Sequence, residues 1–260
     1  NQYAKKALEA GCSYAVIDNP DCYIDERTIL VENVLLTLQL LAHHHRKEMG
    51  CPIIGITGTN GKTTTKELLA AVLKTKYKLL YTEGNLNNQI GVPLTLLRLT
   101  HEHEMAVIEM GASHPGDIKE LVDIVHPNYG VITNVGKAHL EGFGSFEGVV
   151  KTKGELYDYI RQNDGTVFIN QENPFLMDIA EGIEQITYGT TDSAFVSGSV
   201  VSCNPFLTFG WKQQDSLHTV ETHLIGSYNL DNVLVAVSIG CYFKIPAEQI
   251  NQAITAYEPT

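Results

Sequence analysis

The stretch from Cys51 to Lys76 constrains the fold more than any other part of the chain. A short apolar run, rich in β-branched isoleucine at positions 53–56, is typical of a buried parallel strand. It enters a turn in which Gly58 and Gly61 let the backbone bend tightly and present N–H groups to a polyphosphate. An amphipathic helical pattern follows, whose positive dipole end would face that anion. The sequence therefore predicts a phosphate-binding loop between a strand and a helix.

This loop departs from the strict GxxxxGK[ST] pattern, which requires glycine where this chain has Ile56. An ordinary Gly/Thr-rich turn is the alternative interpretation, and the strand, loop and helix context favours the phosphate loop. In such a loop Lys62 would reach the outer phosphates and Thr63 would offer its hydroxyl to Mg²⁺.

Composition limits the partners and the compartment. The chain has 260 residues, with 18 Lys and Arg against 30 Asp and Glu, and a formal net charge of −12. Such a charge repels a phosphate backbone and argues against nucleic acid as the main partner. Five cysteines without a CxxC pair indicate neither a disulfide framework nor a zinc site. No apolar run approaches the roughly 18 residues of a membrane span. We expect a cytoplasmic monomer that binds neither nucleic acid nor membrane.

The first 50 residues are too few for a domain of their own. Their predicted elements are a helix at 3–9, strands at 13–18 and 22–24, and a helix at 28–48.

Three adjacent histidines, His43 to His45, lie near the end of the last of these helices. Adjacent side chains on a helix point about 100° apart, so the three cannot all face one metal. A solvated helix end is therefore the preferred interpretation.

From Cys51 onward, strand-like and helix-like segments alternate, which predicts right-handed βαβ units and an α/β fold with a mainly parallel sheet flanked by helices. Short β-rich runs between Ile186 and His223 suggest a small antiparallel extension. Two helical patterns at 230–243 and 247–257 close the chain. The predicted alternating elements are strands at 53–57, 77–82, 105–110, 129–135 and 166–170, and helices at 63–76, from 92, 117–125 and 146–160.

Candidate site residues lie where strands end, because ligands of open parallel sheets bind beyond the carboxyl ends of the strands. Glu109 follows an apolar run and suits a Mg²⁺ ligand, with a solvated strand-end glutamate as the alternative. His139 lies in the loop after the next strand, where a lone histidine is usually unremarkable. Lys151 and Lys153 cannot share a helix face, so at most one of them points at the site. Spacing alone favours solvated surface for both lysines.

Asparagines gather at two places. Residues 84–94 read GNLNNQIGVPL, and Asn85, Asn87 and Asn88 exceed what turns and helix caps require. Asn229 and Asn232 precede and begin a predicted helix, where they could cap it or contact the polar edge of a base.

Five motifs in order resemble the Mur ligase family, the ATP-dependent amide-forming enzymes of peptidoglycan precursor synthesis. The segment 82–97, TEGNLNNQIGVPLTLL, is most similar to members that add D-alanyl-D-alanine to UDP-N-acetylmuramoyl-tripeptide. The motifs are TGTNGKTTT at 57–65, EMGA at 109–112, NVGKAHLEGFGS at 134–145, KTKGE at 151–155 and GSYNLDN at 226–232.

The resemblance implies a set of roles. Glu109, His139 and Thr63 would bind Mg²⁺, together with Lys153 if that lysine carries the carbamate found in the family. Lys62, Glu109, His139 and Lys153 would form the catalytic group. Asn229 and Asn232 would approach adenine, and Asn85, Asn87 and Asn88 fall in the family's acceptor-facing loop. The residues matching the ATP phosphate site are Gly58, Thr59, Asn60, Gly61, Lys62, Thr63 and Thr64.

Family members have three domains. By resemblance, residues 1–50 are part of the N-terminal UDP-substrate domain, residues 51–260 are the central ATPase domain, and the C-terminal ligase domain is absent. The chain alone is then expected to bind ATP and to turn over poorly. The implied reaction forms an amide bond through an acyl phosphate. Two alternatives remain, a folylpolyglutamate synthase-like ligase and a nucleotide-dependent binding or switch module. GKTTT in place of GKGS disfavours the first, and Glu109, His139 and Lys153 together disfavour the second.

Overall fold

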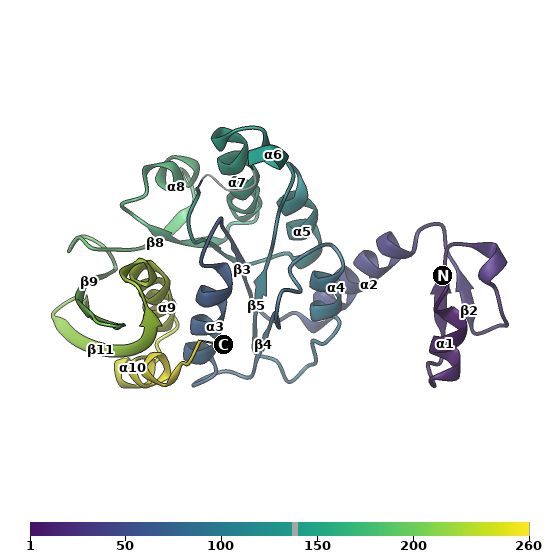
Figure 1. Ribbon diagram of the computed structural model, residues 1–260, viewed down its shortest axis with the longest axis horizontal. Helices are drawn as coiled ribbons and strands as arrows, with labels where there is room; N and C mark the ends of the chain where they lie inside the picture. Colours follow the sequence, from purple (N-terminus) through teal and green to yellow (C-terminus); the bar gives the residue numbers. More distant parts are fainter. Residues whose placement is uncertain (137–139, 260) are drawn as a thin grey trace.

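A nine-stranded sheet organises the chain in the computed structural model, which describes residues 1–136 and 140–259 (Figure 1). Its strand order is β11-β10-β9-β8-β7-β6-β3-β5-β4. All pairings from β4 across to β9 are parallel, and only β9, β10 and β11 pair antiparallel. The strands are β3 (Ile53–Thr57), β4 (Leu79–Tyr81), β5 (Met105–Glu109), β6 (Tyr129–Ile132), β7 (Thr166–Asn170), β8 (Glu184–Gly189), β9 (Val196–Cys203), β10 (Phe206–Gln213) and β11 (Ser216–Ile225).

Helices cover both faces of the sheet, as the alternating pattern predicted. One face packs against α3 (Lys62–Leu73), α9 (Leu230–Tyr242) and α10 (Ala247–Ala256). The other face packs against α4 (Gly91–Leu96), α5 (Asp117–Val125), α7 (Phe146–Gln162) and α8 (Pro174–Ile179). A short helix, α6 (Leu140–Phe143), precedes α7.

Successive residues of the central strands enter opposite cores. Ile53 belongs to the core beneath α5 and α7, whereas Ile54 and Ile56 belong to the core beneath α3 and α9. A strand buried on both faces reads as a continuous apolar run because its side chains alternate between two apolar layers. The expected α/β fold class is therefore confirmed.

The structure corrects three predictions about the elements. β8, which the sequence grouped with the antiparallel extension, pairs in parallel with both β7 and β9. A strand predicted at 22–24 is wrong, because a 3-10 turn (Pro20–Cys22) lies there and β2 (Thr28–Leu30) pairs with β1 (Ala15–Ile17). The helix predicted from residue 28 begins at Val34, since the Asn33 side chain caps it by accepting the Leu36 N–H at 2.8 Å. The helix α8 was not predicted.

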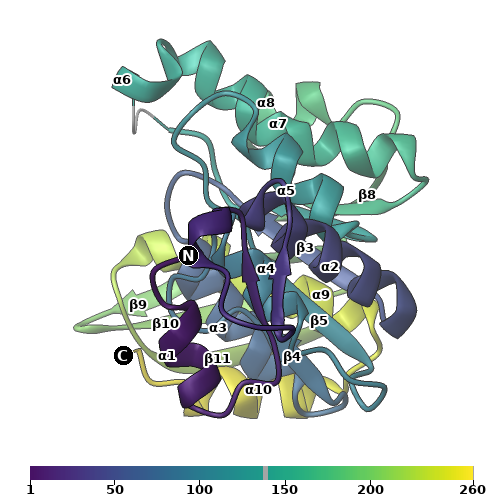
Figure 2. The ribbon, with the colours of Figure 1, turned by 90° about the vertical axis from the view of Figure 1, so that its right-hand side faces the viewer.

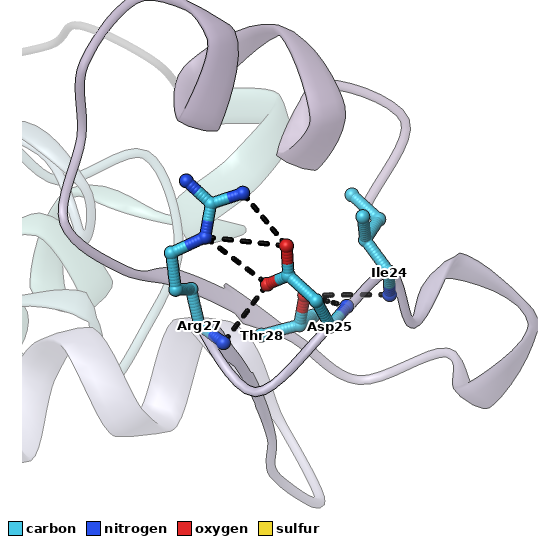
Figure 3. Close-up of polar contacts among 4 residues, drawn as sticks. All are labelled: Ile24, Asp25, Arg27 and Thr28. Atoms are coloured by element: carbon cyan, nitrogen blue, oxygen red, sulfur yellow. Dashed lines mark hydrogen bonds and ion pairs between the residues drawn. The ribbon is translucent and has the colours of Figure 1, made fainter.

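A small module of α1 (Ala4–Glu9), β1 and β2 lies at one end of the molecule and is joined to the large sheet by α2 (Val34–Met49); Figure 2 views the molecule from that end. Its core is small, comprising Ala4, Leu8, Ala15 and Ile17. The loop before β2 is fastened by Asp25, whose carboxylate accepts from the backbone and guanidinium of Arg27 (Figure 3). These hydrogen bonds lower the pKa of Asp25.

The C-terminal half of α2 is bonded to the body of the molecule. Arg46 is 6% exposed and donates to the carbonyl oxygens of Val125 and His126, at 2.9 and 3.1 Å. His43 and His45 contact the carbonyl oxygens of Ile124 and Leu99. The interpretation of these histidines as a solvated helix end is therefore wrong for two of the three, whose rings reach different elements. None of the described helices is both long and apolar enough to cross a membrane.

Two helix-interior glycines provide a matched test of the packing. A Cβ on Gly240 of α9 would lie 2.8 Å from Ile250 and 2.9 Å from Val72, whereas one on Gly154 of α7 would meet Ile179 at an ordinary 3.4 Å. We predict that Gly240→Ala lowers the free energy of unfolding by roughly 1–3 kcal/mol through overpacking. Gly154→Ala should instead raise it by up to about 1 kcal/mol through helix propensity. Urea unfolding measures both, and equal effects at the two sites would contradict this packing.

Candidate active site

The loop between β3 and α3, residues 58–61, is here called the phosphate loop. Gly58 and Gly61 have φ values of +145° and +75°, so the two glycines are required by the backbone, as expected. Gly61 precedes α3 without a side-chain cap. Within the described chain, the backbone N–H groups of residues 61–64 have no hydrogen-bond acceptor. Four free donors at the positive end of a 12-residue helix form a site for an anion.

The end of β6 holds the phosphate loop in place. A Cβ on Gly58 would lie 2.0 Å from the hydroxyl of Thr133, so only glycine fits there. The Asn134 side chain accepts the Asn60 N–H at 3.0 Å and donates to the Asn60 carbonyl at 3.1 Å. The Thr59 N–H donates to the Asn134 carbonyl at 3.0 Å. The loop is thus shaped by the neighbouring strand before any ligand arrives.

Lys62 lies across the phosphate loop. Its ammonium donates to the carbonyl oxygens of Gly58 and Thr59 at 2.9 and 3.0 Å. Burial lowers the pKa of Lys62, and the nearby Glu109 carboxylate partly offsets that effect. A cation at the start of α3, next to the free N–H donors, supplies the local positive charge that an otherwise acidic chain needs to bind a polyphosphate.

Glu109 ends β5 beside this loop and is 1% exposed. The Thr63 hydroxyl lies 3.2 Å from one of its oxygens, and the Asn87 amide donates to the other at 2.9 Å. The solvated strand-end alternative is therefore wrong. Hydroxyl and carboxylate oxygens are the donors that Mg²⁺ prefers, with phosphate oxygens and water completing its shell. Among residues 1–136 and 140–259, no group of three or more His, Cys, Asp or Glu is placed so that it could hold a metal ion. His139, predicted as a ligand, lies outside the described residues.

Lys153 of α7 points inward, whereas Lys151 is exposed, so spacing correctly excluded both facing the site. The preference for solvated surface is wrong for Lys153, which is 3% exposed with its ammonium 5.4 Å from the centroid of the Phe143 ring. Burial lowers the pKa of Lys153 from 10.5 to about 8, helped by the charge of Lys62 and opposed by Asp117 and Glu155. Burial thus favours the neutral form of this amine more than water does.

A cavity of about 300 Å³ lies between the phosphate loop, Lys62 and Lys153. One wall is formed by the asparagine loop, which we define as residues 84–89. Asn87 reaches Glu109, whereas the Asn88 side chain caps α4 by accepting the N–H groups of Ile90 and Gly91. Asn85 is exposed and does not line the cavity. The cavity is lined by Gly58, Thr59, Lys62, Asn87, Asn88, Gln89, Gly111, Ala112, Ser113, Asp117, Phe143 and Lys153.

Asn229 and Asn232 support the phosphate loop from the other side. The Asn232 side chain accepts from the Thr65 hydroxyl at 3.0 Å and donates to the Asn229 side chain at 2.9 Å. A Cβ on Gly61 would lie 2.6 Å from the Asn232 oxygen. Asn229 precedes α9 and does not cap it by its side chain, which donates to the Ile225 carbonyl at 3.0 Å. Their contact with adenine stays a prediction.

Sequence reasoning assigned no role to three residues that the structure places in the site. Thr133 and Asn134 brace the phosphate loop, and Asp117 lines the cavity while accepting the Ser113 and His114 N–H groups. The rule that sites lie beyond the carboxyl ends of strands pointed to Thr133 and Asn134, which follow β6 directly. Asp117 carried no such signal, because it begins a helix.

The fold and the site together define an α/β protein with a phosphate loop of the kind found in nucleotide-binding domains. Residues 56–240 match the Mur ligase middle domain, and the chain therefore belongs to the Mur ligase family. The chain is similar to the UDP-N-acetylmuramoyl-tripeptide--D-alanyl-D-alanine ligase of Bacillus subtilis (strain 168), with 34% identity over 263 residues, which cover 100% of this chain. The chain spans 57% of the length of that relative.

Two solved structures are similar over 100% of this chain. A crystal structure of MurF from Acinetobacter baumannii has a TM-score of 0.89 at 28% identity, and the match covers 57% of that chain. MurF ligase from Thermotoga maritima, solved in complex with ADP, has a TM-score of 0.87 at 27% identity, and the match covers 60% of that chain. The expected resemblance to the members that add D-alanyl-D-alanine is confirmed.

The low pKa of Lys153 predicts how stability depends on pH. Because the folded-state pKa lies at about 8, below the ordinary 10.5, folding disfavours the charged amine, and this penalty disappears as the pH rises from about 8 to 10.5. Relative to Lys153→Met, the unsubstituted protein should gain roughly 1–3 kcal/mol of unfolding free energy across that window. Urea unfolding in CO₂-free buffer measures this difference. Lys151→Met is the exposed control, and a flat difference for Lys153→Met would contradict the burial argument.

Proposed function

We propose that the protein is an ATP-dependent ligase that joins D-alanyl-D-alanine to UDP-N-acetylmuramoyl-tripeptide through an acyl phosphate. The observation that carries this proposal is one cavity lined both by Gly58, Thr59 and Lys62 of the phosphate site and by the asparagine loop, whose Asn87 side chain donates to Glu109. Phosphate donor and acceptor would thus meet in a single space. The names of the relatives, at 34% identity over the whole chain, support the same substrates.

The chain's own groups would act by position and charge. In the first step a carboxylate oxygen of the tripeptide attacks the terminal phosphorus of ATP, and ADP leaves. In the second step the amine of D-alanyl-D-alanine attacks the acyl carbon, loses a proton, and displaces phosphate. Lys62 and the N–H groups of residues 61–64 would hold the phosphates and neutralise charge on the transferring group. Phe143 and Lys153 would bound the space in which the acceptor carboxylate lies.

A divalent cation fits the oxygen donors beside the phosphate loop. Thr63 and Glu109 would hold Mg²⁺, and His139 is the further ligand that the family motif suggests. Bound there, Mg²⁺ would supply charge neutralisation between phosphate oxygens. Lys153 would contribute as a carbamate, since burial favours the neutral amine that carbamate formation requires. Asn229 and Asn232 would lie near the adenine, and Asn85, Asn87 and Asn88 would face the acceptor.

The domain assignment belongs to the same proposal. Residues 1–50 would be part of the UDP-substrate domain and residues 51–260 the ATPase domain, with the family's third domain outside this chain. The separate two-stranded sheet of β1 and β2 supports a division of the chain, although α2 packs on the larger part, with Ala42 in its core. We place the protein in the cytoplasm and expect it to be a monomer.

Two other functions explain less of the site. A folylpolyglutamate synthase-like ligase would share the acyl-phosphate chemistry, but the asparagine loop and the identity to muramoyl ligases favour the muramoyl acceptor. A nucleotide switch has no use for a buried lysine with a pKa of about 8 next to the phosphate loop. Neither alternative is favoured by an observation of its own.

A component-omission assay tests the proposal directly. The protein with its natural termini is incubated with Mg·ATP, UDP-N-acetylmuramoyl-tripeptide and D-alanyl-D-alanine, and phosphate release is measured while each component is left out in turn. We expect release only when all are present. If phosphate is released at the same rate without the tripeptide acceptor and without the dipeptide, the ligase proposal is wrong and the nucleotide switch is favoured. Release with a folyl acceptor would support the other ligase instead.

Lys62→Ala tests the role of the phosphate loop. The substitution removes charge stabilisation at the transferring phosphoryl group, so we predict a loss in turnover on the order of a thousandfold, about 4 kcal/mol. Lys119→Ala is the matched control, because Lys119 lies on the exposed side of α5 in an ion pair with Asp123. A loss of less than about tenfold for Lys62→Ala would exclude that role.

A further inference from the structure

Lys66 is a fully buried cation that the proposed chemistry does not use. It lies one helical turn after Lys62 on α3, and its side chain has 0% exposure. Its ammonium lies 2.9 Å from a carboxylate oxygen of Glu67 and donates to the Gly84 carbonyl at 3.2 Å. The Tyr81 ring centroid lies 5.9 Å away. A buried ammonium is strongly disfavoured unless it is paired, so these partners fix where it lies.

Gly84 is the first residue of the asparagine loop. Its φ is +54°, and a Cβ built on it would contact no other atom. Gly84 is attached to α3 through its backbone carbonyl, which accepts from Lys66. The other end of the loop is fixed at Asn87, whose side chain donates to Glu109 and whose carbonyl accepts the Gly111 N–H at 2.7 Å. The loop is therefore fastened to α3 at one end and to the end of β5 at the other.

One rigid helix thus holds both halves of the site. The first turn of α3 carries Lys62 and Thr63 of the phosphate site, and the next turn carries Lys66, which holds the acceptor-facing loop. The rise between Lys62 and Lys66 is about 6 Å at 1.5 Å per residue. Since α3 is packed against α9, its two turns cannot shift independently.

We infer that Lys66 is a positioning residue that sets the distance between the bound phosphates and the acceptor by holding Gly84. This inference rests on the proposed function. Attack of the acceptor carboxylate on phosphorus requires the reacting atoms to approach within about 3–3.5 Å, and small misplacements are costly in rate. Releasing Gly84 moves the acceptor wall and leaves the phosphate loop, which is braced by Thr133 and Asn134, in place.

Lys66→Met tests the inference in the protein with its natural termini. Methionine keeps much of the apolar stem and removes the donor. We expect kcat/KM for UDP-N-acetylmuramoyl-tripeptide to fall at least about tenfold, while the Kd for Mg·ATP changes less than about twofold. Hydrogen exchange should rise in residues 84–89 and stay unchanged in α3. Lys74→Met is the control, because Lys74 is exposed and its ammonium lies 4.0 Å from the centroid of the same Tyr81 ring.

Three results would overturn the inference: unchanged exchange in residues 84–89, equal losses for acceptor and Mg·ATP, or the same losses in Lys74→Met. If Lys66→Met does not fold, Lys66→Arg replaces it. The larger fork keeps a donor but displaces Gly84, so acceptor kcat/KM should fall while the Kd for Mg·ATP holds, and unchanged acceptor kinetics would again overturn the inference. Hydrogen exchange is measured without turnover. It therefore tests whether Lys66 holds residues 84–89 even if the omission assay shows that the proposed function is wrong.

Discussion

Close contact between the phosphate loop and its neighbours is the constraint on which the site depends. Gly58 is pressed against Thr133 at the end of β6, and Gly61 against Asn232 of α9. A side chain at either glycine would overlap atoms that the rest of the fold holds in place. The loop therefore owes its shape to two elements remote in sequence, and its N–H groups are oriented toward the ligand position in advance. Such preorganisation spares the reorganisation that a flexible loop would require on binding.

Burial then determines the electrostatics of this preformed site. An acidic chain brings two lysines, Lys62 and Lys153, close enough that the charge of one lowers the pKa of the other. Burial lowers the pKa of both lysines; Glu109 partly offsets this for Lys62, and Asp117 and Glu155 partly offset it for Lys153. The two amines differ in their surroundings although both lie on the same cavity. Lys62 lies across the phosphate loop, where its ammonium donates to the Gly58 and Thr59 carbonyls, whereas Lys153 lies beside the Phe143 ring.

Periodicity and loop chemistry predicted most of the fold, because strands buried on both faces and helices with one apolar face leave strong local patterns. The prediction failed where pairing decides the outcome. β8 looks like the strands of the antiparallel extension, and only its neighbours β7 and β9 make it parallel. In the site, Glu109 followed from its place after an apolar strand. The burial of Lys153 could not be predicted from the sequence. Helix spacing shows that Lys151 and Lys153 cannot both face the site, but it does not show which of them does. The support that Asn232 gives to the phosphate loop likewise became visible only from its tertiary contact with Thr65.

The hydrogen bond between Thr65 and Asn232 joins residues 167 positions apart. Contacts of such long sequence separation form late, because the intervening chain must first be ordered. The support of the phosphate loop is thus completed only when α9 packs against α3. During synthesis on the ribosome, a chain that has not yet released α9 would lack this support. The free N–H groups of residues 61–64 would then reach their final arrangement only after residues 230–242 have emerged.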